Sequence, residues 1–240
     1  MNFSLIICTY QRREAIEKLL NSIVDQTLYP NEIIIVDGSL NKETLDFFKA
    51  SNFKHLDYFL VDSNNRGLTK QRNFGISKVA KESEVVCFLD DDTILEDTYF
   101  EELISTYKTN KDALGVGGYI TNEVSWRKKT LSVKFKEFQL DGFVRDLGLR
   151  NLVRKRLGIL SNKPPCIMPS YSHGFSIGFL PPSNKTYEVE YFMGGVSSYK
   201  KEVFDSIQFS TYFEGYGLYE DLDFCLRVSK LGKLYLNTAA

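Results

Sequence analysis

Three short apolar runs in this chain each stop at an acid or a hydroxyl, and this pattern constrains the fold most. The runs cover residues 3–8, 32–36 and 85–89, and Thr9, Asp37 and Asp90 follow them. The runs are rich in β-branched residues and lack strict alternation, which is typical of strands buried on both faces of a parallel sheet. Three such strands are therefore predicted, each with a polar residue at its carboxyl end.

Helical periodicity separates these strands. Apolar residues recur with a spacing of three and four after Arg13, at Ile16, Leu19, Leu20, Ile23 and Val24, before a stop at Pro30. Strands that alternate with helices indicate βαβ units, and open sheets of this kind bind ligands beyond the carboxyl ends of their strands. We therefore expect an α/β fold with a Rossmann-like, mostly parallel central sheet flanked by helices. Thr9, Asp37 and Asp90 should share one crevice.

Composition fits an ordinary globular enzyme. The chain has 240 residues, 43% of them hydrophobic, and a formal net charge of −1. This predicts a single domain, 1–240, with an insertion. The charge gives no reason to expect nucleic acid as a partner. No 18-residue apolar stretch or signal-peptide pattern is present, so we expect a cytoplasmic protein.

The sequence Asp90-Asp91-Asp92 follows the third run directly. If the backbone stays extended, Asp90 and Asp92 point to one side and Asp91 to the other. Two carboxylates on one face suit Mg²⁺ or Mn²⁺, which take carboxylates, water and substrate phosphates as ligands. The alternative is a solvated acidic turn before a helix that starts near Tyr99. Like charges crowded at a ligand-binding edge repel each other without a cation, which favours the metal site.

Other phosphate chemistries fit less well. The loop after Thr9 lacks a G-x-G-x-x-G pattern, and no G-x-x-x-x-G-K-[ST] occurs in the chain. A phosphatase of the haloacid-dehalogenase type would place its D-x-D near the amino terminus with Thr or Val two residues later. Here that position is Ile94, far from the amino terminus.

In its ordered motifs the chain resembles glycosyltransferase family 2, a group of inverting enzymes with the GT-A fold. The motifs are Thr9-Tyr10-Gln11-Arg12, the run into Asp37-Gly38-Ser39, Asn65-Arg66-Gly67 with Gln71-Arg72-Asn73, Asp90-Asp91-Asp92, Gly194-Gly195, and Glu220-Asp221. They cover about residues 1–120 and 188–240 and leave the middle unmatched. The resemblance divides the domain into a nucleotide-sugar-binding part (1–120), an insertion (121–187) and a catalytic part (188–240).

The resemblance implies a role for each matching residue. Thr9, Tyr10 and Asp37 match positions around the base and ribose, where Asp37 would accept a hydrogen bond from a pyrimidine N–H. Arg12 and Arg72 match basic positions near the phosphates. The implied donor-binding set also includes Asp90 and Asp91, and the implied metal ligands are Asp92 and Asp90.

The acceptor side follows from the same resemblance. Gly194 and Gly195 match acceptor-binding positions, and Asp221, with Glu220 beside it, matches the acidic motif that supplies the general base. The implied activity is an inverting, metal-dependent transfer of sugar from a nucleotide-diphosphate donor to a saccharide or lipid-linked hydroxyl, with UDP or dTDP favoured. This chemistry suits surface polysaccharide or glycolipid assembly. An inactive nucleotide-sugar-binding module and a metal-dependent phosphatase or nucleotidyltransferase are the alternatives.

Several of these residues also have simpler explanations. Asp37 before Gly38 could be a turn residue, and Arg72 could be a surface charge on a helix. Glu220 and Asp221 could only stabilise the start of a helix with Leu222, Leu226 and Leu231 on its apolar face. Asp223 can pair with Arg227 one turn later, so we assign it to structure.

Two regions differ from the family pattern. The insertion interleaves aromatic and basic residues. It could bind an acceptor, or it could rest on the anionic inner face of the cell membrane. The alternative is a solvated basic loop. Family members usually continue past the acidic motif to a metal-binding His, which His55 and His173 do not match. We therefore expect the protein to extend beyond residue 240.

Overall fold

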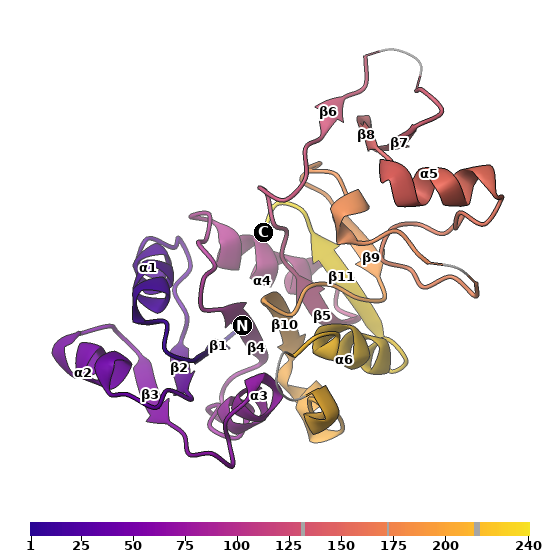
Figure 1. Cartoon of the computed structure of the whole chain (residues 1–240). Coiled ribbons are helices and arrows are strands. Elements are labelled where there is room, and N and C mark those ends of the chain that lie inside the picture. The colour runs from indigo at the N-terminus through magenta and orange to yellow at the C-terminus, as the bar shows by residue number, and fades with distance from the viewer. Residues whose placement is uncertain (131–132, 172, 214–216) are drawn as a thin grey trace.

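The computed structural model describes residues 1–130, 133–171, 173–213 and 217–240. Its centre is an eight-stranded sheet with the strand order β3-β2-β1-β4-β10-β5-β11-β9 (Figure 1). The strands are β1 (Phe3–Thr9), β2 (Glu32–Asp37), β3 (Leu56–Leu60), β4 (Val85–Asp90), β5 (Ala113–Gly117), β9 (Thr186–Val189), β10 (Val196–Lys200) and β11 (Lys233–Asn237). The three predicted strands are β1, β2 and β4.

The sheet is mostly parallel, as expected, and its architecture is that of the GT-A fold. Strand β1 pairs in parallel with both β2 and β4, and β2 pairs in parallel with β3. Strand β10 runs antiparallel between β4 and β5, and β9 runs antiparallel at the edge beside β11. Because β1, β2 and β4 are adjacent and parallel, Thr9, Asp37 and Asp90 come to one edge of the sheet.

Helices cover both faces of this sheet. They are α1 (Arg13–Val24), α2 (Glu43–Ala50), α3 (Leu68–Ile76), α4 (Tyr99–Thr109) and α6 (Glu220–Val228), with short 3₁₀ turns η2 (Lys201–Asp205) and η3 (Thr211–Phe213). On one face, Leu5 and Ile7 pack in the same cluster as residues of α1 and α4. On the other, Ile6 shares a cluster with Phe224 of α6 and with Phe74 of α3. This double cover explains the continuous apolar runs.

The helix predictions were right in position and wrong in detail. Helix α1 buries Ile16, Leu19, Leu20 and Ile23. Val24 is the last residue of the helix, and its side chain is exposed to solvent. Helix α6 ends at Val228 rather than near Gly232. Its buried apolar residues are Phe224, Cys225 and Val228, whereas Leu231 lies outside the helix and is exposed.

The insertion has a structure of its own. Strands β6 (Arg127–Lys128), β7 (Glu137–Leu140) and β8 (Phe143–Asp146) form a small antiparallel sheet, followed by α5 (Gly148–Arg156) and η1 (Ile177–Phe179). Leu147, Phe175 and Phe179 make a separate small core with Phe138. The irregular sequence pattern therefore corresponds to a small folded unit beside β9 and β11 (Figure 1).

Candidate active site

The Asp triplet lies where β4 ends. The backbone N–H of Asp90 donates to the carbonyl of Gly195 at 3.0 Å, and the chain then turns. The side chains of Asp90 and Asp92 are 52% and 56% exposed, whereas Asp91 is buried. Asp91 is thus buried and its two neighbours are exposed, but the strand ends at Asp90, so the extended backbone expected for the triplet is not present beyond its first residue.

Asp91 is held from inside the protein. The hydroxyl of Thr9 donates to its Oδ2 at 2.7 Å, and Nη1 of Arg12 donates to its Oδ1 at 2.7 Å. Burial raises the pKa of the Asp91 carboxyl, and these two partners oppose the rise. The other end of the Arg12 guanidinium, Nη2, donates to Asp92 at 2.7 Å. Arg12 therefore links two of the three carboxylates.

Asp37 is fully buried at the end of β2. Its Oδ1 accepts the backbone N–H of Ser39 at 2.7 Å, as in a turn, and its Oδ2 accepts the hydroxyl of Tyr58 at 2.6 Å. Both oxygens thus have partners inside the protein. Contact with a base N–H stays a prediction, and it requires the carboxylate to open toward the neighbouring cavity.

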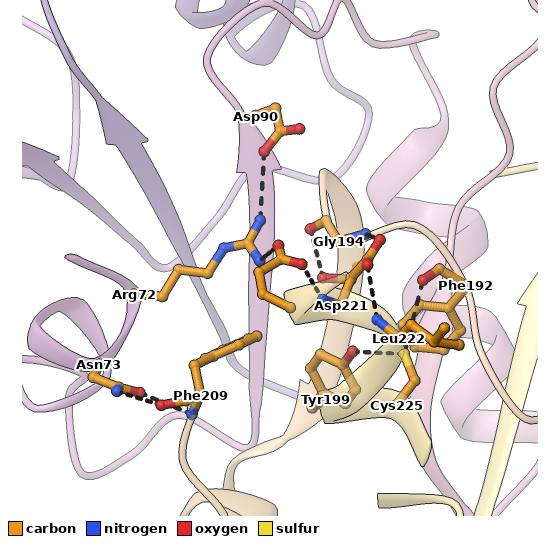
Figure 2. Close-up of polar contacts among 12 residues, drawn as sticks. Arg72, Asn73, Asp90, Phe192, Gly194, Tyr199, Phe209, Asp221, Leu222 and Cys225 are labelled. Atoms are coloured by element: carbon orange, nitrogen blue, oxygen red, sulfur yellow. Dashed lines mark hydrogen bonds and ion pairs between the residues drawn. The ribbon is translucent and has the colours of Figure 1, made fainter. Parts of the chain in front are cut away.

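Arg72 is not a surface charge. It is 2% exposed and forms an ion pair with Glu220 and a longer contact, 3.4 Å, with Oδ1 of Asp90. Its guanidinium carbon lies 5.8 Å and 5.2 Å from the ring centres of Phe88 and Phe209. Arg72 therefore joins α3, β4 and α6 beneath the site (Figure 2). A direct contact with donor phosphates stays a prediction.

The acidic motif opens helix α6. Tyr219 before it adopts a left-handed backbone, with φ of 68°. Burial raises the pKa of Glu220 to about 7, against the opposing effect of Arg72. Asp221 accepts the N–H of Gly194 on Oδ2 at 3.2 Å and the N–H of Leu222 on Oδ1 at 2.7 Å. Glu220 thus pairs with Arg72. Asp221 is directed toward the Gly194 backbone (Figure 2).

Gly194 and Gly195 allow three segments to approach closely. A Cβ on Gly195 would lie 2.2 Å from Oδ2 of Asp90, and a Cβ on Gly194 would lie 2.9 Å from Cβ of Asp221. A side chain at either position would displace Asp90 or the residues at the start of α6. Their backbone thus lies between β4 and α6, and their acceptor-binding role stays a prediction.

Two cavities of about 560 Å³ each border the triplet. Both include Asp90 and Asp92 in their walls. The cavity on the β1 side, which we call the first cavity, is lined by Cys8, Thr9, Tyr10, Arg12, Arg66, Gly67, Leu68, Gln71 and the three aspartates. The second cavity lies on the other side, and its walls include Tyr99, Tyr119, Asn122, Glu123, Met193, Gly195 and residues 238–240.

Two residues of the first cavity were quoted in the motifs without a role. Gln71 is buried and donates to the carbonyls of Thr9 at 3.1 Å and Val36 at 2.8 Å, so it ties the ends of β1 and β2 to α3. Nε of Arg66 donates to the carbonyl of Gly38 at 2.6 Å. Gln71 lies in the first turn of α3 and Arg66 in the loop just before that helix, and a polar residue at such a place was the available signal.

The carboxylates at the rim fit a hard divalent cation. Asp90 and Asp92 present exposed oxygens to both cavities, and Mg²⁺ or Mn²⁺ typically takes one or two carboxylates plus phosphate oxygens. Within the described ranges, no three His, Cys, Asp or Glu side chains gather as a complete protein-made metal site. Asp92 and Asp90 can therefore act as ligands only together with oxygens from substrate or water.

The family model for glycosyl transferase family 2 matches residues 4–207. The chain belongs to glycosyltransferase family 2. The match runs through the insertion, which the sequence motifs had left unmatched, and ends before Glu220 and Asp221. The motifs of β1, β2, α3, β4 and Gly194-Gly195 all lie inside it.

Two curated relatives of this family 2 chain carry names that refer to glycan assembly. A glucosyl-dolichyl phosphate glucuronosyltransferase of Haloferax volcanii is 34% identical over 133 residues, which are 53% of this chain and 41% of that protein. The O-antigen chain rhamnosyltransferase RfbN of Salmonella typhimurium is 33% identical over 98 residues, 41% of this chain and 30% of that protein. The matched parts thus span less than half of either relative.

Solved structures share the fold of this family 2 chain. S. aureus TarS 1–349 in complex with UDP-GlcNAc superposes with a TM-score of 0.61 at 17% identity, covering 100% of this chain and 57% of that chain. GalNAc-T7 with UDP, GalNAc and Mn²⁺ superposes with a TM-score of 0.65 at 16% identity, covering 99% and 42%. At this identity the likeness establishes the GT-A architecture.

Proposed function

We propose that this protein transfers a sugar, with inversion, from a nucleotide-diphosphate donor to a hydroxyl acceptor. The donor would occupy the first cavity, beside Thr9, Tyr10 and Arg12, and the acceptor would approach from the second cavity, beside Gly195. Asp90 and Asp92 stand between the two cavities, where the sugar must pass.

One observation carries this proposal. Asp90 at the end of β4 and Asp221 at the start of α6 are more than a hundred positions apart in the chain. They are brought together across Gly194 and Gly195, where a side chain would displace them. This proximity supports a site in which an acid on the acceptor side would stand beside the acids on the diphosphate side. A transfer between two bound substrates needs this arrangement.

Asp221 would act as the general base. The acceptor oxygen forms a bond to the anomeric carbon as the bond from that carbon to the diphosphate oxygen breaks, and the hydroxyl proton passes to Asp221. The N–H groups of Gly194 and Leu222 hold one lone pair of each carboxylate oxygen and leave the others free. The products are the glycoside, the nucleoside diphosphate and a proton.

The departing diphosphate needs positive charge. A bound Mg²⁺ or Mn²⁺ held by Asp92 and Asp90 would neutralise the charge that develops there. Arg12, which pairs with Asp92 at 2.7 Å, stands beside the same position and can turn one of its N–H groups toward a phosphate oxygen. The metal dependence and the ion are part of the proposal.

UDP or dTDP is the proposed nucleotide. Asp37 is buried beside Thr9, which lines the first cavity, and its carboxylate would suit the ring N–H of a pyrimidine once its hydrogen bond to Tyr58 opens. Two structures of similar fold, TarS and GalNAc-T7, were solved with UDP or UDP-GlcNAc. The sugar is left open by these observations.

The proposed acceptor is a saccharide or a lipid-linked hydroxyl at the inner face of the cell membrane. Support comes from the named activities of the relatives, a transferase to a dolichyl phosphate-linked sugar and an O-antigen chain transferase. In the described part of the chain, none of the helices is long and apolar enough to cross a bilayer.

A thermal-shift panel of UDP-, dTDP- and GDP-sugars, with and without Mn²⁺, tests the donor. A ligand at about 100 times its Kd should raise the free energy of unfolding by about 2.7 kcal/mol. UDP- or dTDP-sugars should stabilise most, and only fully with the metal. Clear preference for GDP-sugars would refute the pyrimidine assignment.

Product analysis separates the competing activities. A transferase should release nucleoside diphosphate in step with glycosylated acceptor. A phosphatase or nucleotidyltransferase would release phosphate or pyrophosphate without sugar transfer, and an inactive binding module would show donor stabilisation without either product.

A further inference from the structure

Helix α5 of the insertion exposes an apolar stripe. Leu149, Val153 and Leu157 are spaced four residues apart, at the helix and its carboxyl end, and are 84%, 55% and 67% exposed. Side chains with this spacing lie on one face of a helix. The helix itself buries no residue. An exposed stripe of this kind marks an interaction surface rather than part of the core.

Basic side chains flank this stripe on both sides. At 100° per residue, Arg156 lies on one side of Leu149, and Arg150 and Arg154 lie on the other side of Val153. Helix α5 contains no acidic residue. Among the described residues, none of these arginines forms an ion pair with a carboxylate. Their charges therefore remain available to an anionic partner.

The inner face of α5 is fixed to the insertion. Lys155 donates to the carbonyl of Phe135 at 2.6 Å and lies 4.5 Å from the centre of its ring. Leu147, just before the helix, is buried in the small aromatic core, and its N–H donates to the carbonyl of Lys136 at 2.9 Å. The stripe is thus held outward, at the margin of the molecule opposite α1 and α2 (Figure 1).

The charge of the whole insertion favours the same kind of partner. Residues 121–187 contain twelve Lys or Arg and four Asp or Glu, a surplus of eight positive charges in a chain of net charge −1. Such a surplus attracts an anionic surface. A soluble polyanion would use the arginines but would leave the three apolar side chains in water, whereas a lipid surface accommodates both.

We propose that α5 docks on an anionic lipid bilayer. Leu149, Val153 and Leu157 enter the boundary between headgroups and acyl chains, and Arg150, Arg154 and Arg156 contact lipid phosphates. Asn122 and Glu123 of the insertion also line the second cavity. Where the proposed function holds, docking therefore brings the acceptor side of the site toward a lipid-linked substrate.

Vesicle co-sedimentation tests the proposal. The full chain should sediment with vesicles of phosphatidylcholine and phosphatidylglycerol and remain soluble with phosphatidylcholine alone. The triple variant Leu149→Ser, Val153→Ser, Leu157→Ser should lose this binding. Its control is the pair Leu40→Ser and Leu231→Ser, which alters side chains exposed elsewhere, at 68% and 59%, and should bind like the wild type.

The charges have their own test. Arg150→Gln with Arg156→Gln should weaken vesicle binding by roughly 25-fold, since each charge near an anionic surface contributes about fivefold. No sedimentation of the wild type, or equal sedimentation of the triple variant, would overturn the proposal. Retained vesicle binding by the triple variant, with complete displacement of both proteins by a soluble polyanion such as heparin, would identify a polyanion site instead.

Measurements of donor binding distinguish a failure of the docking proposal from a failure of the proposed function. The triple variant should keep the stabilisation by UDP-sugar, because α5 touches neither cavity. Vesicle binding without any sugar transfer would refute the proposed function and leave the docking surface standing. Transfer to a soluble acceptor without vesicle binding would refute the docking surface and leave the proposed function standing.

Discussion

At the scale of single residues, the two neighbouring acids of the motif have different surroundings. Glu220 is buried against Arg72, whereas Asp221 is half-buried and faces the Gly194 backbone. Sequence alone left open whether either one does more than stabilise the start of a helix. Their partners differ: Glu220 joins the Arg72 ion pair and Asp221 accepts the Gly194 N–H, which is why Asp221 stays the proposed base.

Asp221→Asn is the decisive substitution for the base. Asn keeps the shape but cannot take the hydroxyl proton, so the transfer rate should fall roughly 10²-fold or more. Donor affinity and melting temperature should barely change. Steady-state transfer and thermal unfolding, measured on the same preparation, check both statements.

Asp223→Asn is the matched control for that change. Asp223 lies two residues later on the same helix and pairs with Arg227 at 2.6 Å, so its loss should cost up to about 1 kcal/mol and leave transfer intact. If Asp221→Asn behaves like Asp223→Asn, the base lies elsewhere.

Glu220 should make stability depend on pH. Its folded-state pKa, about 7, lies above the ordinary value of 4.5, so the folded protein holds this proton more tightly. The contribution is fully present below about pH 4.5 and is lost as pH rises through about 7. Relative to Glu220→Gln, the wild type should lose on the order of 1–3 kcal/mol of unfolding free energy across this window.

Urea denaturation of both proteins between pH 4.5 and 8 measures this loss. The comparison cancels the other titrating groups, because they are common to the two proteins. Parallel stability curves would show that Glu220 titrates normally.

At the scale of elements, the site depends on how closely three segments approach. The end of β4, the turn before β10 and the start of α6 meet where a Cβ on Gly195 would lie 2.2 Å from Oδ2 of Asp90. The Asp90 side chain cannot keep its position beside such a methyl group. Gly194-Gly195 therefore sets the separation between Asp90 and Asp221.

Gly195→Ala should damage the site more than the fold. Asp90 must move away from Arg72, so metal-dependent donor affinity should fall at least about tenfold, with destabilisation of about 1–3 kcal/mol from overpacking. Titration of UDP in the presence of Mn²⁺ measures the first quantity and urea unfolding the second. Unchanged affinity would show that the position of Asp90 is not critical for donor binding.

At the scale of the whole molecule, the acidic edge of the sheet is balanced without a metal. Arg12 pairs with Asp91 and Asp92, and Arg72 reaches Asp90. These cations offset the repulsion that the three carboxylates would otherwise impose on the fold. The ligand-free protein should therefore not need a divalent ion to stay folded.

Removal of metal with EDTA should separate stability from binding. The melting temperature of the ligand-free protein should stay constant, whereas the stabilisation by UDP-sugar should largely disappear. Asp92→Asn should reproduce the effect of EDTA on donor binding. A fall in the melting temperature of the ligand-free protein on chelation would show instead that the metal is structural.

The sequence by itself determined the order of strands and helices in the first half and the edge where the polar residues gather. Buried parallel strands need continuous apolar runs, so β1, β2 and β4 are visible in the pattern, and Thr9, Asp37 and Asp90 follow from it. The apolar face of α6 was misjudged, because Phe224 and Cys225 pack on β10 neighbours that no local period identifies.

Only the tertiary structure decided how the polar side chains pair. Arg72 reads as a helix surface charge in the sequence, yet it is buried between Glu220 and Asp90, because α3 and α6 meet over the same strand end. The hydrogen bond from Tyr58 to Asp37 and the exposure of the apolar face of α5 were likewise decided by the tertiary structure. Pairing and exposure depend on contacts between residues far apart in the chain, and a local pattern carries no information about which of them meet.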